Sequence, residues 1–318
     1  MLLDAASVWS KAWPILFAIL FFGVIILIHE LGHFTVAKLS GIKVNEFAIG
    51  MGPKLLSFGK GETKYSLRLI PMGGYVQMEG EDEASEDERA FNQKPVWKRF
   101  LVVIAGAVMN IILGLVLVAI LLTQQNLIGT TQIAGFHENA SSQSSGLQEG
   151  DVITHINGTS VWSDRDISFL MARDRDGVID FTVKRDGQKT ELKNVKFDTR
   201  EVDGQTVITF DFIIIGENKT FWNVLKTSFL ETASMARLVW LSLFDLVTGR
   251  FGLSDLAGPV GTVSVIAEAT TSGGFLNALS LMAFITINIG VFNLLPIPGL
   301  DGGRLFFLII EGIRRKPI

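Results

Sequence analysis

The sequence has 318 residues, of which 48% are hydrophobic and 19% are charged, and its mean hydropathy is +0.39. Because soluble globular proteins carry about 25% charged residues, this composition indicates a membrane protein. The absence of cysteine excludes disulfides, a thiol nucleophile and cysteine-ligated metal sites, and the net charge of −4 argues against nucleic acid as a partner.

Three uncharged runs each reach the roughly 20 residues that a membrane-spanning helix needs. They are residues 12–28, continuing through His29 and Glu30 to residue 37, then residues 101–136, and the run between Glu268 and Asp301. The first run could also be a signal peptide, but its start is not basic and no small-residue cleavage site precedes the charged residues. We therefore expect three retained spans.

Basic residues near the span ends predict the orientation of the chain. The first span is followed by Lys38 and Lys43, and the second is preceded by Lys94, Lys98 and Arg99. The third span is followed by Arg304, Arg314, Arg315 and Lys316. We expect a multi-pass protein of the inner or plasma membrane, with residues 38–97 and the basic C-terminal end in the cytoplasm. The N-terminus and residues 125–265 are expected outside the cytoplasm.

The segments between the spans differ in kind. Residues 41–80 alternate short apolar stretches with Gly and Pro, which is typical of β-hairpins. Residues 79–89 (EGEDEASEDER) are acidic and predict a mobile, solvated loop. Residues 222–248 are apolar but interrupted by charges, which favours an amphipathic helix at the bilayer surface over a fourth span.

Residues 130–215 predict a small independent α+β domain. VITHI at 152–156, VIDFTVKR at 178–185 and KTELKNVKF at 189–197 are typical of strands, and DRDISFLMARD at 164–174 is typical of a short helix. The segment SGLQEGDVITHING at 145–158 resembles a PDZ domain. In that fold a peptide adds as a strand at the edge of a groove, and we expect one copy.

The first span contains the pentapeptide His29-Glu30-Leu31-Gly32-His33. Its i, i+4 spacing puts both imidazoles on one helix face, where they can bind one zinc ion, and Glu30 can act as the general base. These side chains could instead be polar residues at a helix end. However, ionisable groups at membrane depth are usually functional, so we expect a metal site.

A catalytic zinc site needs a third protein ligand and one open position. The other two histidines, His137 and His155, lie in the insert on the other side of the membrane, so we expect a carboxylate. Asp301 closes the third apolar run and is one candidate, although it could be an ordinary helix-end residue. Glu46, on the cytoplasmic side after the first span, is the alternative.

Together these motifs closely resemble the site-2 proteases, and within them the bacterial RseP/RasP-type group. The resemblance includes HELGH at 29–33, GAVMN at 106–110, GPVG at 258–261 and NLLPIPGLDGG at 293–303. It implies that His29, His33 and Asp301 bind Zn²⁺, that Glu30 activates water, and that Asn293 holds the scissile carbonyl or its oxyanion. Asn293 could instead make only an interhelical hydrogen bond, as Asn110 could.

The resemblance also covers the hairpin region and has two departures. Residues 64–81 resemble a membrane-re-entrant β-loop on which an unwound substrate strand pairs, although they could be a cytoplasmic β subdomain without substrate contact. Pro296 and Pro298 are expected to break the third span. Ala107 stands where the family usually has proline, and the usual fourth span is absent from this sequence.

We therefore expect a polytopic α-helical membrane protein with cytoplasmic or re-entrant β-hairpins and an extracytoplasmic PDZ-like α+β domain. Residues 1–124 form the first catalytic membrane part, 125–215 the PDZ-like domain, and 216–318 the second membrane part with the interfacial helix and the third span. By resemblance, the protein is a zinc metalloprotease that cuts single-span substrates within the bilayer after an earlier cleavage, such as anti-sigma factors or remnant signal peptides.

Two other functions fit the sequence less well. One is a membrane-anchored PDZ adaptor with a vestigial metal site, but a purely structural site has no need of the general base Glu30. The other is a metal transporter, but the sequence has one HExxH motif and no repeated halves, whereas many transporters are built from inverted repeats.

Overall fold

The structure is a computed structural model of the chain, and it describes residues 5–174, 176–202, 205–249 and 274–316. The chain divides into two compact units. One comprises the residues up to Val118 together with those from Met235 onward, and the other is Ala119–Ser234. The glycine-rich segment 258–261 that contributed to the resemblance lies outside the described residues.

Three helices in the described residues are long and apolar enough to cross a membrane. They are Ile15–Leu39, which belongs to α1 (Ala5–Leu39), α2 (Val96–Gln124) and α7 (Gly274–Phe292). Within the described residues, these three helices coincide with the three predicted spans. Helix α5 (Phe221–Val247) forms where an amphipathic helix was predicted and is not one of these three. The chain is therefore a membrane protein.

Glycines let the membrane helices approach one another closely. A Cβ atom on Gly32 of α1 would lie 2.5 Å from the carbonyl oxygen of Ala105 in α2. A Cβ on Gly290 of α7 would lie 3.1 Å from the carbonyl oxygen of Ala107 in α2. Because lipid tails are as apolar as the side chains, such close backbone contact is a main source of helix association in a bilayer.

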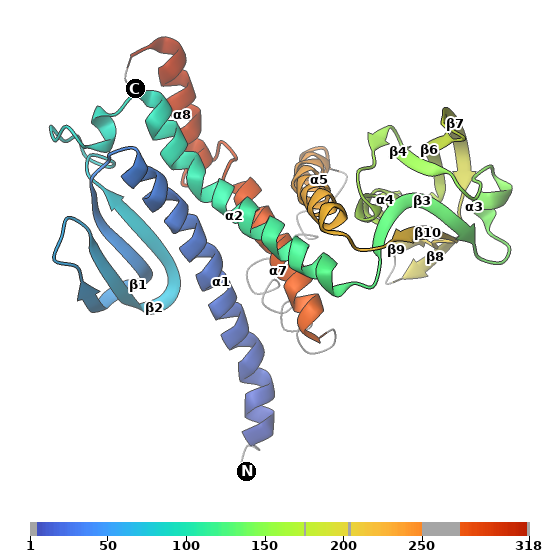
Figure 1. Ribbon diagram of the computed structural model, residues 1–318, viewed down its shortest axis with the longest axis horizontal. Coiled ribbons are helices and arrows are strands. Elements are labelled where there is room, and N and C mark those ends of the chain that lie inside the picture. The colour runs from blue at the N-terminus through green and yellow to red at the C-terminus, as the bar shows by residue number, and fades with distance from the viewer. Residues whose placement is uncertain (1–4, 175, 203–204, 250–273, 317–318) are drawn as a thin grey trace. The chain divides into compact units, whose positions relative to one another are not determined.

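Strands β1 (Val44–Phe58) and β2 (Lys64–Met78) form a long antiparallel hairpin beside the C-terminal half of α1 (Figure 1). Residues 44–49 are the central segment, because they pair with 74–78 on one side and with 64–67 on the other. Residues 65–68 pair in turn with the second half of β1. Among the described residues, no strand pairs with the outer edge of 74–78. The predicted hairpin structure is confirmed.

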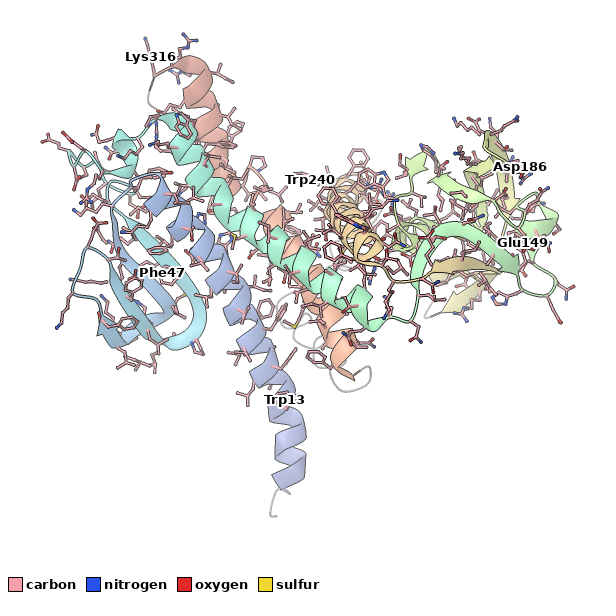
Figure 2. All side chains as sticks on the ribbon, viewed as in Figure 1. Trp13, Phe47, Glu149, Asp186, Trp240 and Lys316 are labelled. Carbon is pink, nitrogen blue, oxygen red and sulfur yellow. The ribbon has the colours of Figure 1, made fainter. Side chains whose placement is uncertain are left out.

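The hairpin packs onto α1 through aromatic residues. The ring of Phe47 (labelled in Figure 2) lies 5.2 Å from that of Phe34 in α1, and both lie near Tyr65. Phe47 belongs to a buried cluster that also contains Ala37 of α1, Val76 of β2, Val102 of α2 and Leu305 of α8 (Asp301–Arg314). This core joins the hairpin to α1, α2 and α8, the elements that carry the candidate site.

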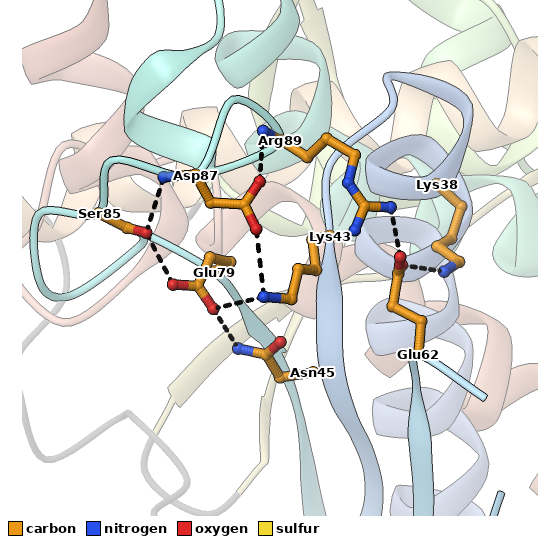
Figure 3. Close-up of polar contacts among 8 residues, drawn as sticks. All are labelled: Lys38, Lys43, Asn45, Glu62, Glu79, Ser85, Asp87 and Arg89. Atoms are coloured by element: carbon orange, nitrogen blue, oxygen red, sulfur yellow. Dashed lines mark hydrogen bonds and ion pairs between the residues drawn. The ribbon is translucent and has the colours of Figure 1, made fainter. Parts of the chain in front are cut away.

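The acidic segment 79–89 is held by cations (Figure 3). Lys43 lies 3.4 Å from Glu79 and 3.2 Å from Asp87, and Arg89 pairs with Glu62 of the hairpin. Backbone hydrogen bonds from Lys43 to Arg89 and from Glu79 to Lys43 join the same stretches. These contacts tie Glu79 and Asp87 to Lys43, whereas none of residues 79–89 is buried and most are exposed. The segment is therefore solvated, and its mobility stays a prediction.

The third span ends as the two prolines predict. Helix α7 stops at Phe292, a turn containing Pro296 and Pro298 follows, and helix α8 runs from Asp301 to Arg314. The Gly302 N–H donates to the Asn293 carbonyl at 2.7 Å, and a Cβ on Gly302 would collide with the Leu295 carbonyl. The turn therefore folds back onto the start of α8, and this fixes the position of Asp301.

The second unit contains a mixed α and β fold. Its main sheet has the order β10-β3-β4-β6-β7, with β5 paired to β4, and β8 and β9 form a separate hairpin. The predicted strands and short helix are present. The elements are β3 (Ile128–Phe136), α3 (Ser141–Ser144), β4 (Val152–Ile156), β5 (Thr159–Ser160), α4 (Asp164–Ala172), β6 (Val178–Arg185), β7 (Gln188–Lys196), β8 (Thr199–Val202), β9 (Gln205–Ile208) and β10 (Phe212–Glu217).

Candidate metal centre

Helix α1 presents His29 and His33 on the same face. Their Nε2 atoms lie 3.2 Å apart and their ring centroids 4.8 Å apart. The Nδ1 atom of His33 lies 2.8 Å from the Val102 carbonyl oxygen. Because a carbonyl only accepts hydrogen bonds, Nδ1 of His33 carries the proton and Nε2 keeps a free lone pair for a ligand.

Asp301, the first residue of α8, faces both imidazoles. Its Oδ2 atom lies 3.1 Å from His29 Nε2 and 3.3 Å from His33 Nε2. One ligand atom from each of the three residues lies within 4.8 Å of the others. The Asp301 Oδ2 atom is buried and makes no hydrogen bond of acceptable geometry. Two imidazoles and a carboxylate converging in this way fit a zinc ion with one open position.

Glu46, the alternative carboxylate, is engaged within the hairpin. It accepts hydrogen bonds from Ser66, from Lys54 at 3.0 Å and from Arg68 at 3.1 Å. Burial raises the pKa of the Glu46 carboxyl, but these hydrogen bonds outweigh burial and lower the pKa to about 2. Glu46 is not part of the histidine and aspartate cluster found among the described residues.

A cavity of about 440 Å³ opens onto the cluster, and Glu30 is part of its wall. Helix α1, the edge segment 74–78, the acidic segment, α2 and the start of α8 line it. The lining residues are His29, Glu30, His33, Tyr75, Val76, Gln77, Met78, Glu81, Asp82, Val103, Asp301 and Arg304. A Cβ on Gly74 would lie 3.3 Å from the Glu30 Cγ atom. The free edge of the hairpin therefore lies directly beside Glu30.

Helix α2 contacts both histidines from a single face. Val102, Gly106 and Asn110 follow one another at intervals of four residues. The Asn110 Nδ2 atom lies 3.3 Å from His29 Nδ1. A Cβ on Gly106 would lie 2.4 Å from His33 Nε2 and 2.7 Å from His29 Nε2. The sequence analysis singled out Gly106 and Asn110 within the motif GAVMN, but it predicted no contact between this motif and the histidines.

Arg304 and Glu81 are a second feature of the cavity that sequence reasoning missed. Arg304 of α8 forms ion pairs with Glu81 and, at 3.1 Å, with Asp82. All three side chains line the cavity. The acidic segment is therefore joined to α8 one turn after Asp301.

Asn293 directly follows α7 and is partly buried. Its backbone carbonyl accepts the hydrogen bond from Gly302 that fixes the start of α8. Its side chain is not part of the cavity wall described above. A backbone hydrogen bond therefore joins Asn293 to Gly302, the residue that follows Asp301. The expected oxyanion role of the Asn293 side chain stays a prediction.

The chain is similar to known zinc proteases over almost its whole length. Residues 17–318 match the sequence profile of peptidase family M50. A relative from Clostridium acetobutylicum is 41% identical over 305 residues, which make up 96% of this chain and 88% of the relative. The regulator of sigma-W protease RasP of Bacillus subtilis is 31% identical over 382 residues, covering 94% of this chain and 90% of that protein. The zinc metalloprotease RasP of Bacillus licheniformis is 32% identical, with coverage of 94% and 90%.

Proposed function

Because the chain belongs to peptidase family M50 and is a zinc-dependent intramembrane protease, we propose that His29, His33 and Asp301 hold the zinc ion. The observation that carries the assignment is the convergence of three ligand atoms on one point of the cavity wall. The relatives do not favour the PDZ adaptor with a vestigial site.

Glu30 is the proposed general base. When bound, zinc supplies Lewis-acid chemistry that activates a water molecule and polarises the scissile carbonyl. Glu30 lines the same cavity as the three ligands, where its carboxylate takes a proton from the attacking water and returns it to the leaving amine. The neutral side-chain amide of Asn293 donates to the developing oxyanion without adding a charge to the bilayer.

The edge segment 74–78 is the proposed binding site for an unwound substrate. Residues 75–78 line the cavity, and no strand of the described chain pairs with the outer edge of the segment. An extended peptide added there would run past Glu30. Pairing with this edge would also supply hydrogen bonds to substrate backbone groups that a bilayer cannot satisfy.

The proposed substrates are transmembrane segments of single-span proteins that an earlier cleavage has shortened. The name of the Bacillus subtilis relative, regulator of sigma-W protease, supports anti-sigma factors as one class. Remnant signal peptides are the second class, because they are also short apolar helices that must unwind before hydrolysis. The lipid bilayer is the common environment of enzyme and substrate.

The unit Ala119–Ser234 contains the proposed PDZ-like domain, and we place this unit outside the cytoplasm. Its order of elements, with the segment SGLQEGDVITHING containing β4, supports the PDZ likeness. The basic residues after α1, before α2 and in α8 support a cytoplasmic location for the hairpin and the basic C-terminal end.

The proposed ligand set predicts opposite results for two carboxylates. We expect the purified protein to hold about one zinc ion, as a single three-ligand site with one open position would. Asp301→Ala should lose most of it, because a ligand is removed. Glu46→Ala should keep zinc, because Glu46 is bound within the hairpin. Elemental analysis of both proteins is the measurement, and full zinc in Asp301→Ala with loss in Glu46→Ala would contradict the ligand set.

The proposed orientation predicts which single cysteines react in intact cells. The chain has no cysteine, so Glu149→Cys and Ala84→Cys would each introduce one exposed thiol. A membrane-impermeant maleimide should label the cysteine at Glu149 and not the one at Ala84. Both should be labelled after the membrane is disrupted, which controls for access. The reverse pattern in intact cells would show that the orientation is inverted.

A further inference from the structure

We propose that Asn110 is the positioning residue for His29: its side-chain amide oxygen accepts the Nδ1–H proton of the imidazole and directs Nε2 toward the zinc. The proposal deepens the ligand set proposed above and rests on it. Asn110 lies on α2, 81 residues from His29 in the sequence, and its side chain is completely buried.

Two observations at Asn110 point to this role. The Nδ2 atom lies 3.3 Å from His29 Nδ1, on the side of the ring away from Asp301. The Oδ1 atom is buried and has no hydrogen-bond partner. A buried amide oxygen without a partner is costly, and in native proteins such an atom usually has a specific reason.

The chemistry of the ring decides which amide atom faces it. For His29 to bind metal through Nε2, that nitrogen must carry no proton, so the single proton of the neutral imidazole lies on Nδ1. An Nδ1–H group needs an acceptor, which Nδ2 cannot be. A half-turn of the amide about χ2 exchanges the two atoms, which have nearly the same shape. Oδ1 then accepts from Nδ1, and Nδ2 takes the buried position that Oδ1 leaves.

His33 shows the same arrangement with a backbone group. Its Nδ1 atom donates to the Val102 carbonyl at 2.8 Å, and Val102 lies two turns before Asn110 on the same helix face. Helix α2 therefore orients both rings, His33 through a carbonyl and His29 through a side chain. Outer partners of this kind commonly contribute a factor of roughly 10–100 in metal affinity.

The test compares zinc affinity in three variants of the full chain. Asn110→Leu keeps the approximate volume and removes the acceptor, whereas Asn110→Asp keeps an oxygen that can accept from Nδ1. Asn288→Leu is the matched control, because Asn288 lies in α7 and donates to the Phe284 carbonyl. Affinity is measured by chelator competition on folded, detergent-solubilised protein. We expect Asn110→Leu to bind zinc about 10–100-fold more weakly. Asn110→Asp and Asn288→Leu should bind it like the wild type.

A purely structural role predicts a different result. Asn110→Leu would then lower the melting temperature while the folded fraction bound zinc with wild-type affinity, and that outcome would overturn the proposal. An equal loss in Asn110→Asp and Asn110→Leu would also overturn it. The variant His29→Ala distinguishes failure of the ligand set from failure of the Asn110 role. Undiminished zinc binding in His29→Ala would refute the ligand set. Loss of zinc in His29→Ala together with wild-type affinity in Asn110→Leu would refute only the role of Asn110.

A second measurement applies even if Asn110→Leu does not fold. In zinc-loaded wild type labelled with ¹⁵N-histidine, NMR should show His29 protonated at Nδ1 and bound to metal through Nε2. The Nδ1–H resonance should move in Asn110→Asp, because a carboxylate is the stronger acceptor. An unprotonated His29 Nδ1, or a resonance that does not change in Asn110→Asp, would overturn the proposal.

Discussion

Replacing Gly106 with alanine is expected to abolish zinc binding and proteolysis together. The new Cβ atom would lie 2.4 Å from His33 Nε2 and 2.7 Å from both Nε2 and Cε1 of His29. The rings would have to move, and moving them displaces the nitrogens from Asp301. The zinc content of purified Gly106→Ala protein should fall to that of His33→Ala. Zinc content and specific activity equal to the wild type would show that the rings do not occupy the metal-binding position.

Gly114→Ala is the matched control for this substitution. Gly114 lies on the same helix two turns later, and its new Cβ would lie 2.3 Å from the Ile287 Cγ1 atom. An isoleucine side chain can repack at a cost of about 1–3 kcal/mol, so the melting temperature should fall. The zinc content should stay at the wild-type level, because the atoms nearest the new Cβ belong to Ile287 and Ala283, which are not among the proposed ligands. Loss of zinc in both variants would indicate a general packing effect.

The substitution Glu30→Gln is expected to separate metal binding from catalysis. Glutamine keeps the shape of the side chain and removes the base, so zinc should be retained. General acid–base catalysis commonly contributes roughly 10²–10⁴-fold, and the loss of water activation should bring turnover close to background. The assay is cleavage of a detergent-solubilised single-span peptide with a helix-destabilising residue near its middle, with zinc content measured on the same sample.

Two further variants are compared with Glu30→Gln: a control at a carboxylate outside the cavity, and a substitution of the proposed oxyanion donor. Glu62→Gln weakens two ion pairs outside the cavity wall, with Lys38 and with Arg89, and should retain activity because exposed pairs contribute at most about 1 kcal/mol each. Asn293→Ala should keep zinc and lose roughly 10²–10³-fold in turnover if its side chain donates to the oxyanion. Undiminished cleavage in Glu30→Gln would refute the proposed base. Full activity of folded Asn293→Ala would leave Asn293 with only a structural role.

Local sequence patterns determined much of the architecture. The uncharged runs predicted the described spans, because a bilayer requires long apolar helices whatever their neighbours are. Alternation and turn residues predicted the hairpin region and the strands of the second unit. Pro296 and Pro298 predicted the end of α7. Within the site, the i, i+4 spacing alone put His29 and His33 on one face, since helical geometry fixes that relation.

Contacts between distant segments were decided only by the tertiary structure. The spacing of residues left Asp301 and Glu46 both open as the third candidate ligand, and family resemblance favoured Asp301. The fold brings Asp301 to the two imidazoles, while Ser66, Lys54 and Arg68 hold Glu46 in the hairpin. Proximity to the histidines depends on how the turn after α7 packs onto α8, and residue spacing carries no information about that packing.

The role of helix α2 was likewise invisible in its own sequence. Gly106 and Asn110 fit any closely packed membrane helix, where small residues and an occasional amide are common. Their contacts with His29 and His33 arise because α1 and α2 meet at Gly32 and Ala105, which brings this face of α2 against the imidazoles. The sequence by itself predicted the long apolar helices and placed the two histidines of the proposed zinc site on one of them. The crossing of those helices decided which side chains and backbone groups surround it, because a crossing is set by packing between residues that no local pattern connects.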